Sequence, residues 1–211
     1  KPIAEYGLVR EKIAQMTVEC FAAESAVWMV AHYIDSGCED YSVEAAITKV
    51  FASEAMQRTA YESLQIAGGN GYMRELPYEQ YVRDARILPI FEGTNEILRL
   101  YIALSSLKEV GASLKELKSA VGSIFNDPIK GFGVLSGYAE RRFARATGLG
   151  AAVKVSTPVA PALRPLVGIY ESYARATARV AESVLRKYGR GISDQQHSQR
   201  RIADLMIDLF V

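Results

Sequence analysis

The sequence predicts an all-α protein: a helical bundle, then a linker, then a second, incomplete helical bundle. One reason is that apolar residues recur every three or four positions over residues 5–36, as on one face of a helix. They are Val9, Ile13, Met16, Cys20, Ala23, Val27, Val30 and Ile34. We expect this stripe, with Trp28 and Met29, to be core. Another reason is that no strand pattern is convincing, since the best candidate, AAVKVS, is short.

The first two helices are predicted to be long. The loop DSGCEDYS at 35–42 is rich in turn formers and ends the first helix, and Ser42 is expected to cap the second. The second helix runs to about Ala67. It stops at Gly68 and Gly69, because glycine takes the left-handed conformation that closes a helix.

Two shorter helices are predicted next. Pro77 opens the first of them, since proline is tolerated in the first turn of a helix, and this helix runs to about Ile87. Thr94 has the side chain of an N-cap for the second. That helix is expected to continue to Val110 and to end at Gly111.

The texture of the chain changes after this point. Residues 120–168 hold four of the seven prolines and many glycines, which is typical of a linker. One basic amphipathic piece lies within it, at 130–146. A long helix is predicted from Leu166 to Tyr188, and a further one from about Ser193 or Asp194.

We therefore divide the chain into a helical domain over 1–112, a basic amphipathic linker over 113–165 and the start of a second helical domain over 166–211. The chain stops within RIADLMIDLFV, a periodic helix without a C-cap glycine, so we expect the second domain to be truncated. Residues 1–110 carry 10 basic and 16 acidic side chains, and residues 111–211 carry 15 and 8. The second half is thus basic and can face a different partner from the first.

Composition excludes several classes of function. Two cysteines without CxxC spacing and two isolated histidines argue against a disulfide scaffold or a metal site. No apolar run approaches the ~20 residues that span a bilayer. No nucleic-acid reading motif is present. GGNGY does not follow a strand and is no dinucleotide fingerprint, and neither a phosphate loop nor a Ser–His–Asp pattern occurs.

Glu92 is the residue that remains. It lies among Ile87, Leu88, Ile90 and Phe91, just before a predicted helix. It is either an exposed acid that complements the helix dipole or a base held in a dry pocket. A carboxylate shut away from water becomes a usable general base. The residues alone leave both interpretations open.

A resemblance adds to this picture. The segments QIAGGNGYMRELPYEQYVRDARI and IFEGTNEILRL are similar to the C-terminal helical domain of the FAD-dependent acyl-CoA dehydrogenases. The shared features are Gln-x-x-Gly-Gly-x-Gly-Tyr, an Arg-Asp pair and Glu-Gly-Thr, in this order. NDPIKGFGVLSGYAERRFARATGLG and ESVLRKYGRGISDQQHSQRRIADLMIDLF resemble the extra C-terminal region of the very-long-chain branch of that family.

The resemblance implies roles for individual residues. Glu92 would be the base that removes the α-proton of an acyl-CoA thioester. Phe91 and Gly93 would lie beside the bound substrate. Residues expected to contact FAD are Thr94, Asn95 and Glu96 near the flavin, and Gln65, Gly68 and Gly69 near the adenine–pyrophosphate part of a neighbouring subunit's cofactor. No metal is implied.

The resemblance also implies the setting. The expected function is oxidation of long-chain acyl-CoA to trans-2-enoyl-CoA in fatty acid β-oxidation by a dimer or tetramer. Electron-transfer flavoprotein would be the acceptor, and residues 130–146 would meet a membrane surface. The location would be the mitochondrial matrix or inner membrane surface in a eukaryote, and the cytoplasm in a bacterium. We expect the 211-residue chain alone to be inactive. The alternative is a helical scaffold or assembly module that binds a membrane or protein partner through its basic second half.

Overall fold

The computed structural model describes residues 1–108 and 158–211, and within these ranges it contains helices and turns but no strand. The prediction of an all-α fold is therefore confirmed. The chain forms two compact units, one of Lys1–Ile102 with Phe210–Val211 and one of Ala103–Leu209. The amphipathic piece predicted at 130–146 lies outside the described residues.

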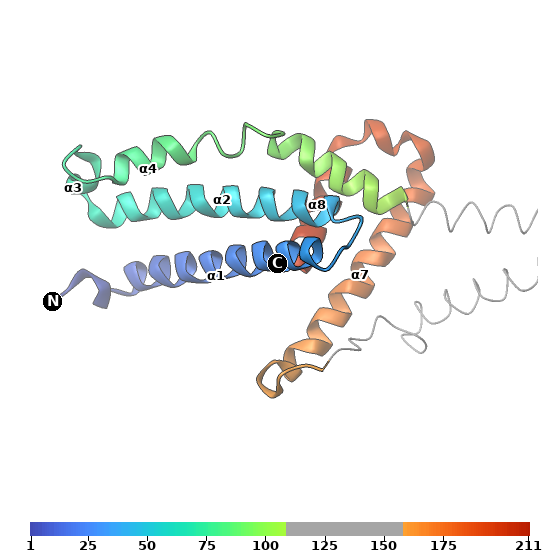
Figure 1. The fold of residues 1–211 in the computed structure, drawn as a ribbon, viewed down its shortest axis with the longest axis horizontal. Coiled ribbons are helices and arrows are strands. Elements are labelled where there is room, and N and C mark those ends of the chain that lie inside the picture. The colour runs from blue at the N-terminus through green and yellow to red at the C-terminus, as the bar shows by residue number, and fades with distance from the viewer. Residues whose placement is uncertain (109–157) are drawn as a thin grey trace, which may run out of the picture. The chain divides into compact units, whose positions relative to one another are not determined.

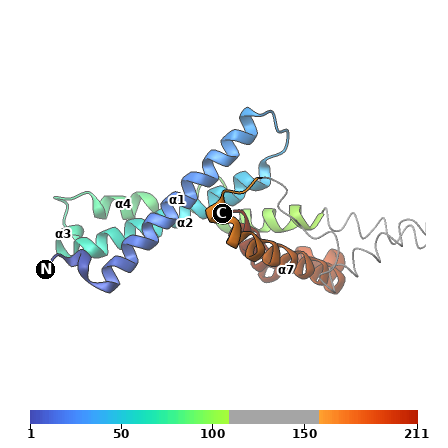
Figure 2. The same cartoon turned by 90° about the horizontal axis from the view of Figure 1, so that it is seen from below.

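The first unit is built around one central helix. After a short 3₁₀ turn, η1 (Ile3–Glu5), come the helices α1 (Gly7–Asp35), α2 (Ser42–Ala67), α3 (Gly69–Tyr72) and α4 (Tyr78–Ala85). A helix over residues 95–108 follows, of which the part up to Ile102 belongs to this unit. Figure 1 shows α2 between α1 and α4, with α3 at the turn that joins α2 to α4. Figure 2 shows α1 crossing α2 diagonally.

Burial is concentrated on α2 because neighbours cover it on both sides. Val50 is fully buried and Ile47 is 2% exposed. Ala46, Ala55 and Ala60 are buried as well, and such short side chains let neighbouring helices approach closely. The position of α2 thus fixes the places of α1 and α4.

The predicted core stripe of α1 is wrong in part. The buried side chains of α1 are Glu19, Ala26 and Val30, which lie at helical spacing on one face. Trp28 is 69% exposed and Met29 is 47% exposed, although both were expected in the core. The reason is that α1 is apolar on more than one face, whereas α2 covers only one of them.

The start of α2 also differs from the prediction. Tyr41 occupies the N-cap position and Ser42 is the first helical residue. The backbone N–H and the hydroxyl of Ser42 both donate to Asp40 Oδ1, at 3.2 and 2.6 Å. The aspartate therefore performs the capping expected of the serine.

The end of α2 agrees with the prediction. Gly68 has φ +63°, the left-handed region that favours glycine, and it ends the helix. Gly71, two residues into α3, is needed for a different reason. A Cβ there would come within 2.7 Å of the Leu64 carbonyl oxygen and 2.8 Å of Ala67 Cβ. Close packing of α3 on the end of α2 leaves room only for glycine.

A polar cluster joins the helix that begins at residue 95 to α2. Arg99 donates to both carboxylate oxygens of Glu54, at 2.7 and 3.0 Å, and Asn95 Nδ2 donates to Glu54 Oε1 at 3.2 Å. Burial acts to raise the pKa of Glu54 and is the largest single effect, but the hydrogen bond and charge of Arg99, with Asn95 and Arg58, outweigh it and lower that pKa. The carboxylate is therefore held in its charged form.

The second unit contains α7 (Arg164–Tyr188), preceded by the 3₁₀ turn η2 (Pro161–Leu163). The 3₁₀ turn η3 (Gly189–Asp194) and α8 (Gln196–Phe210) follow. The long helix α7 begins two residues before the predicted Leu166, and α8 begins slightly after the predicted start.

One buried side chain fixes the turn between α7 and α8. Gln199 is fully buried and its Nε2 donates to the carbonyl oxygens of Ile192 and Ser193, at 2.6 and 2.9 Å. The apolar residues Ile192, Ile202, Ala203 and Ile207 are buried in this unit. Among the described residues, no helix has both the length and the apolar character needed to cross a membrane.

The lowered pKa of Glu54 predicts a pH-dependent contribution to stability. Its stabilising effect is complete above the unfolded-state pKa of about 4.3 and is lost as pH falls through the lower folded-state pKa. We expect the difference in unfolding free energy between the wild type and Glu54→Gln to be largest above about pH 5 and to shrink in more acidic solution. Urea unfolding at a series of pH values measures it, with Glu24→Gln on α1 as control. A difference independent of pH would contradict the assignment.

The close contact at Gly71 predicts that Gly71→Ala destabilises the first unit by roughly 1–3 kcal/mol, because the added methyl group collides with backbone. Gly69→Ala is the matched control in the same short helix, since a Cβ at Gly69 meets nothing within 4 Å. Urea midpoints of the two variants measure the difference. Equal midpoints would show that α3 shifts freely and that its packing on α2 is loose.

Candidate functional site

Glu92 lies in the loop between α4 and the helix that begins at residue 95. Its φ is +52°, and among the described residues it is the one non-glycine residue with positive φ. A left-handed conformation costs a residue with a Cβ roughly 1–2 kcal/mol. Surrounding contacts must therefore hold the backbone of Glu92 in this state.

Backbone hydrogen bonds close the loop on both sides of Glu92. The Phe91 N–H donates to the Ile87 carbonyl oxygen at 3.1 Å, and the Asn95 N–H donates to the Pro89 carbonyl oxygen at 3.0 Å. Gly93 follows with φ +86°, and a Cβ there would come within 3.3 Å of Leu98. The Glu-Gly pair thus forms a tight turn in which the second residue has to be glycine.

The helix that follows the loop begins as predicted. The Ile97 N–H donates to Thr94 Oγ1 at 3.3 Å, and the Leu98 N–H donates to the Thr94 carbonyl oxygen at 2.9 Å. Thr94 therefore caps this helix. Glu96 is exposed in the first turn.

Lys49, on α2, forms a clamp on the loop by binding it at two points. Its Nζ donates to the Gly93 carbonyl oxygen at 2.7 Å and to Asn95 Oδ1 at 2.8 Å. Desolvation by burial lowers the pKa of Lys49, although the carboxylates of Glu96 and Glu54 act in the opposite direction. The lysine is thus a cation taken partly out of water and compensated by oxygen acceptors.

Asn95 completes the clamp and is only 2% exposed. Its Nδ2 donates to Ser53 Oγ at 3.0 Å and to Glu54 Oε1 at 3.2 Å, while its Oδ1 accepts from Lys49. These contacts use both amide hydrogens. The structure therefore gives Asn95 a role in holding the loop, and the contact of this side chain with a flavin stays a prediction.

Glu92 itself is exposed in this chain. It lines neither the groove between α1, α2 and α4 nor the smaller pocket beside α3 and α4. The dry pocket expected from its apolar neighbours is thus not formed by the described part of the chain. Of those neighbours, Ile87, Ile90 and Phe91 show between 47 and 49% of their surface and Leu88 is half-buried, while Ile97, after the loop, is 59% exposed.

The residues expected to bind FAD fall into two separate groups. Thr94 and Glu96 lie beside Glu92, whereas Gln65, Gly68 and Gly69 are exposed at the other end of α4, next to α3 (Figure 1). The helix α4 lies between the two groups, and its eight residues alone are roughly 12 Å long. A Cβ at Gly68 or Gly69 would meet nothing within 4 Å, so the backbone there is open to close approach by a planar ligand.

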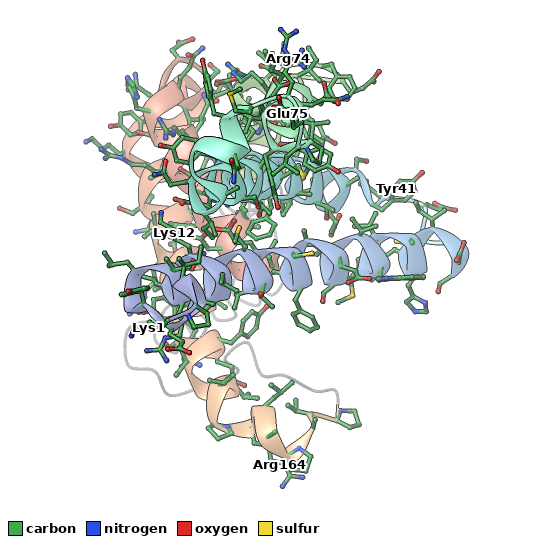
Figure 3. All side chains as sticks on the ribbon, turned by 90° about the vertical axis from the view of Figure 1, so that its left-hand side faces the viewer. Lys1, Lys12, Tyr41, Arg74, Glu75 and Arg164 are labelled. Carbon is green, nitrogen blue, oxygen red and sulfur yellow. The ribbon has the colours of Figure 1, made fainter. Side chains whose placement is uncertain are left out.

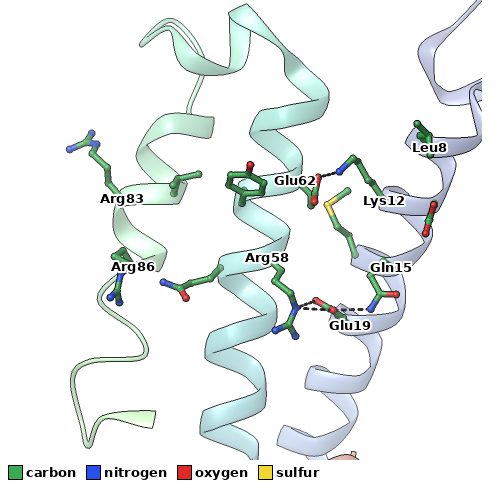
Figure 4. Close-up of a pocket in the computed structure, with 13 residues that line it drawn as sticks. Leu8, Lys12, Gln15, Glu19, Arg58, Glu62, Arg83 and Arg86 are labelled. Atoms are coloured by element: carbon green, nitrogen blue, oxygen red, sulfur yellow. Dashed lines mark hydrogen bonds and ion pairs between the residues drawn. The ribbon is translucent and has the colours of Figure 1, made fainter. Parts of the chain in front are cut away.

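A groove of about 940 Å³ lies between α1, α2 and α4 (Figure 4). Two ion pairs cross its floor, Lys12 with Glu62 and Arg58 with Glu19, the latter at 2.9 Å. Figure 3 shows Lys12 directed from α1 toward α2. None of the residues predicted for the site lines this groove.

Lys49, Ser53 and Glu54 were not among the residues predicted for the site. The available signal was their position, because polar side chains at 49 and 53 share a face of an otherwise alanine-rich apolar helix. Nothing in the sequence showed that the loop at Glu92 covers that face. No group of three or more metal-ligating side chains occurs in the described ranges.

Residues 1–107 match the family model described as the acyl-CoA dehydrogenase C-terminal domain. The chain is 39% identical over 208 residues to the very long-chain specific acyl-CoA dehydrogenase of Homo sapiens, a match that covers 99% of this chain and 31% of that protein. It is 38% identical over 107 residues to the short-chain specific enzyme of Bos taurus, covering 51% and 26%. This chain thus spans less than a third of the length of these relatives.

A crystal structure of an acyl-CoA dehydrogenase complexed with FAD from Bacillus anthracis is similar over the whole of this chain and 35% of that one. The TM-score is 0.76 and the sequence identity is 26%. Because the family model matches more than half of the residues, the chain belongs to the acyl-CoA dehydrogenase family, of which residues 1–107 form the C-terminal domain.

Proposed function

We propose that this chain carries the catalytic base of an FAD-dependent enzyme that oxidises long-chain acyl-CoA to trans-2-enoyl-CoA in fatty acid β-oxidation, with Glu92 as the base. The observation that carries the proposal is the backbone of Glu92. It is held in a costly left-handed conformation by contacts to α2, in the sequence Glu-Gly-Thr. Such strain is concentrated at sites where a side chain has to be aimed.

The chemistry required of this chain is modest. The Glu92 carboxylate accepts the proton from the α-carbon of the thioester, and the hydrogen on the β-carbon leaves as a hydride with its electron pair, so that a double bond forms between the two carbons. FAD, when bound, supplies the acceptor for that hydride at flavin N5. The Glu92 backbone N–H would donate to the thioester carbonyl oxygen, where negative charge develops. Phe91 and Gly93 would flank the acyl group.

The exposure of Glu92 fits this proposal if another part of the protein covers the loop. Four apolar side chains around Glu92 are about half exposed, and a surface of this kind is normally covered in a working protein. The chain spans only 31% of its very-long-chain relatives, which leaves most of such a protein to provide the cover. Covering these side chains removes water from the carboxylate and strengthens it as a base.

The two groups of cofactor residues suggest an oligomer. From the resemblance, Thr94 and Glu96 would contact the flavin beside Glu92, and Gln65, Gly68 and Gly69, at the other end of α4, would contact the FAD of a neighbouring subunit. Electron-transfer flavoprotein would reoxidise the enzyme. A mitochondrial source, as for the human relative, would place it in the matrix or at the inner membrane surface. A bacterial source would place it in the cytoplasm.

The proposal predicts that Glu92→Gln, which keeps the shape but not the basicity, lowers the rate of flavin reduction by palmitoyl-CoA about 10²–10⁴-fold or more. Stopped-flow bleaching of the flavin in the FAD-loaded protein that contains this chain measures the rate. Glu24→Gln, an exposed acid on α1, is the control. If the Glu92→Gln variant bleached its flavin at the wild-type rate, Glu92 would not be the catalytic base.

We also predict that the 211-residue chain alone neither retains FAD nor oxidises palmitoyl-CoA. A cofactor site buries 70–90% or more of its ligand, whereas Gln65, Gly68, Gly69 and Glu96 are exposed. Absorbance of the purified chain after incubation with FAD and gel filtration tests this. A yellow protein that palmitoyl-CoA bleaches would show that the chain holds a complete site.

A further inference from the structure

We propose that Lys49 is a positioning residue for the catalytic loop: by binding the Gly93 carbonyl oxygen, it holds the Glu92 backbone in the orientation that aims the carboxylate. The inference rests on the proposed function of Glu92. Lys49 is 43 positions from Glu92 in the sequence and reaches the loop from α2.

The geometry of the contact is specific. Nζ of Lys49 binds the carbonyl oxygen of the residue directly after Glu92 at 2.7 Å, and the Asn95 side-chain oxygen at 2.8 Å. The two acceptors flank Thr94, so a single ammonium group fixes the chain on both sides of the helix cap. The orientation of the peptide between Gly93 and Thr94 is thereby set, and with it the turn that Glu92 begins.

A lysine is suited to this task because its three N–H donors can serve several acceptors at once. Its placement is not free of cost, since desolvation disfavours the cation, as the lowered pKa of Lys49 shows. The compensating charge comes from Glu54 and Glu96. A neutral side chain of the same length would fill the space but leave the Gly93 carbonyl oxygen without this donor.

The attachment of the following helix to α2 does not depend on Lys49. Arg99 pairs with both oxygens of Glu54, and Asn95 Nδ2 binds Ser53 and Glu54. None of these bonds involves Lys49. Loss of Lys49 should therefore free the turn at 92–94 without detaching the helix, which separates positioning of the base from general stability.

The test uses the FAD-loaded protein that contains this chain, with palmitoyl-CoA as substrate. We expect Lys49→Met to lower kcat about 10–100-fold, the cost of a displacement of about 1 Å at a reacting group. KM and FAD content should stay close to those of the wild type. Solvent deuterium exchange at the substrate α-carbon, which reports proton abstraction, should fall in parallel. Lys49→Arg, which keeps a cation and several donors, should retain most of kcat.

The matched control is Val50→Ala, next to Lys49 on the same helix. It opens a cavity at a fully buried position and should lower the melting temperature while leaving kcat near the wild-type value at low temperature. If Lys49→Met does not yield folded protein, Lys49→Gln, which keeps one donor group, is measured in the same way. Wild-type kcat and exchange in the folded lysine variant would overturn the inference, as would an equal loss of kcat in Val50→Ala.

Glu92→Gln, measured in parallel, separates the two levels of the proposal. If Glu92→Gln is inactive and Lys49→Met is fully active, only the positioning role falls. If Glu92→Gln remains active, the proposed base is wrong and the inference about Lys49 falls with it.

Discussion

The contact between α2 and the segment 93–99 is the interaction on which the candidate site depends. Lys49 and Glu54 both belong to α2, and through Gly93, Asn95 and Arg99 they fix a loop that has little regular structure of its own. Charged and amide groups are suited to this because their bonds are directional, whereas apolar packing tolerates sliding. The cost of desolvating them is met by pairing opposite charges within the cluster.

This cluster explains how Glu92 can have a fixed backbone conformation although its side chain is exposed. Loops owe their precision to the scaffold beneath them, and here the scaffold is the most buried helix of its unit. The backbone of Glu92 is therefore fixed although its side chain meets solvent in this chain. The described residues fix the backbone that directs the Glu92 side chain, but they do not shield its carboxylate from water.

The helix α1 also carries large apolar side chains that no other described part of the first unit covers. Phe21 and Trp28 lie seven residues apart on α1, on the side away from the buried Glu19 and Val30, and are 72 and 69% exposed. If a second face of α1 were also covered, the side chains of Phe21 and Trp28 would be buried. The expectation that periodicity identifies the core failed here because a period shows that a face is to be buried, and not what buries it.

The sequence by itself determined the described helices and most of their approximate ends, the cap at Thr94, the stop at Gly68 and the Glu-Gly-Thr segment, whereas the helix end predicted at Val110 and Gly111 lies outside the described residues. These features are local: they depend on side-chain spacing and on the backbone preferences of a few neighbouring residues. Only the tertiary structure showed that Lys49 reaches Gly93, that Asn95 turns inward, and that Trp28 lies outside. Those outcomes depend on contacts between residues some 40 positions apart and on which faces find a partner, and no local pattern encodes either.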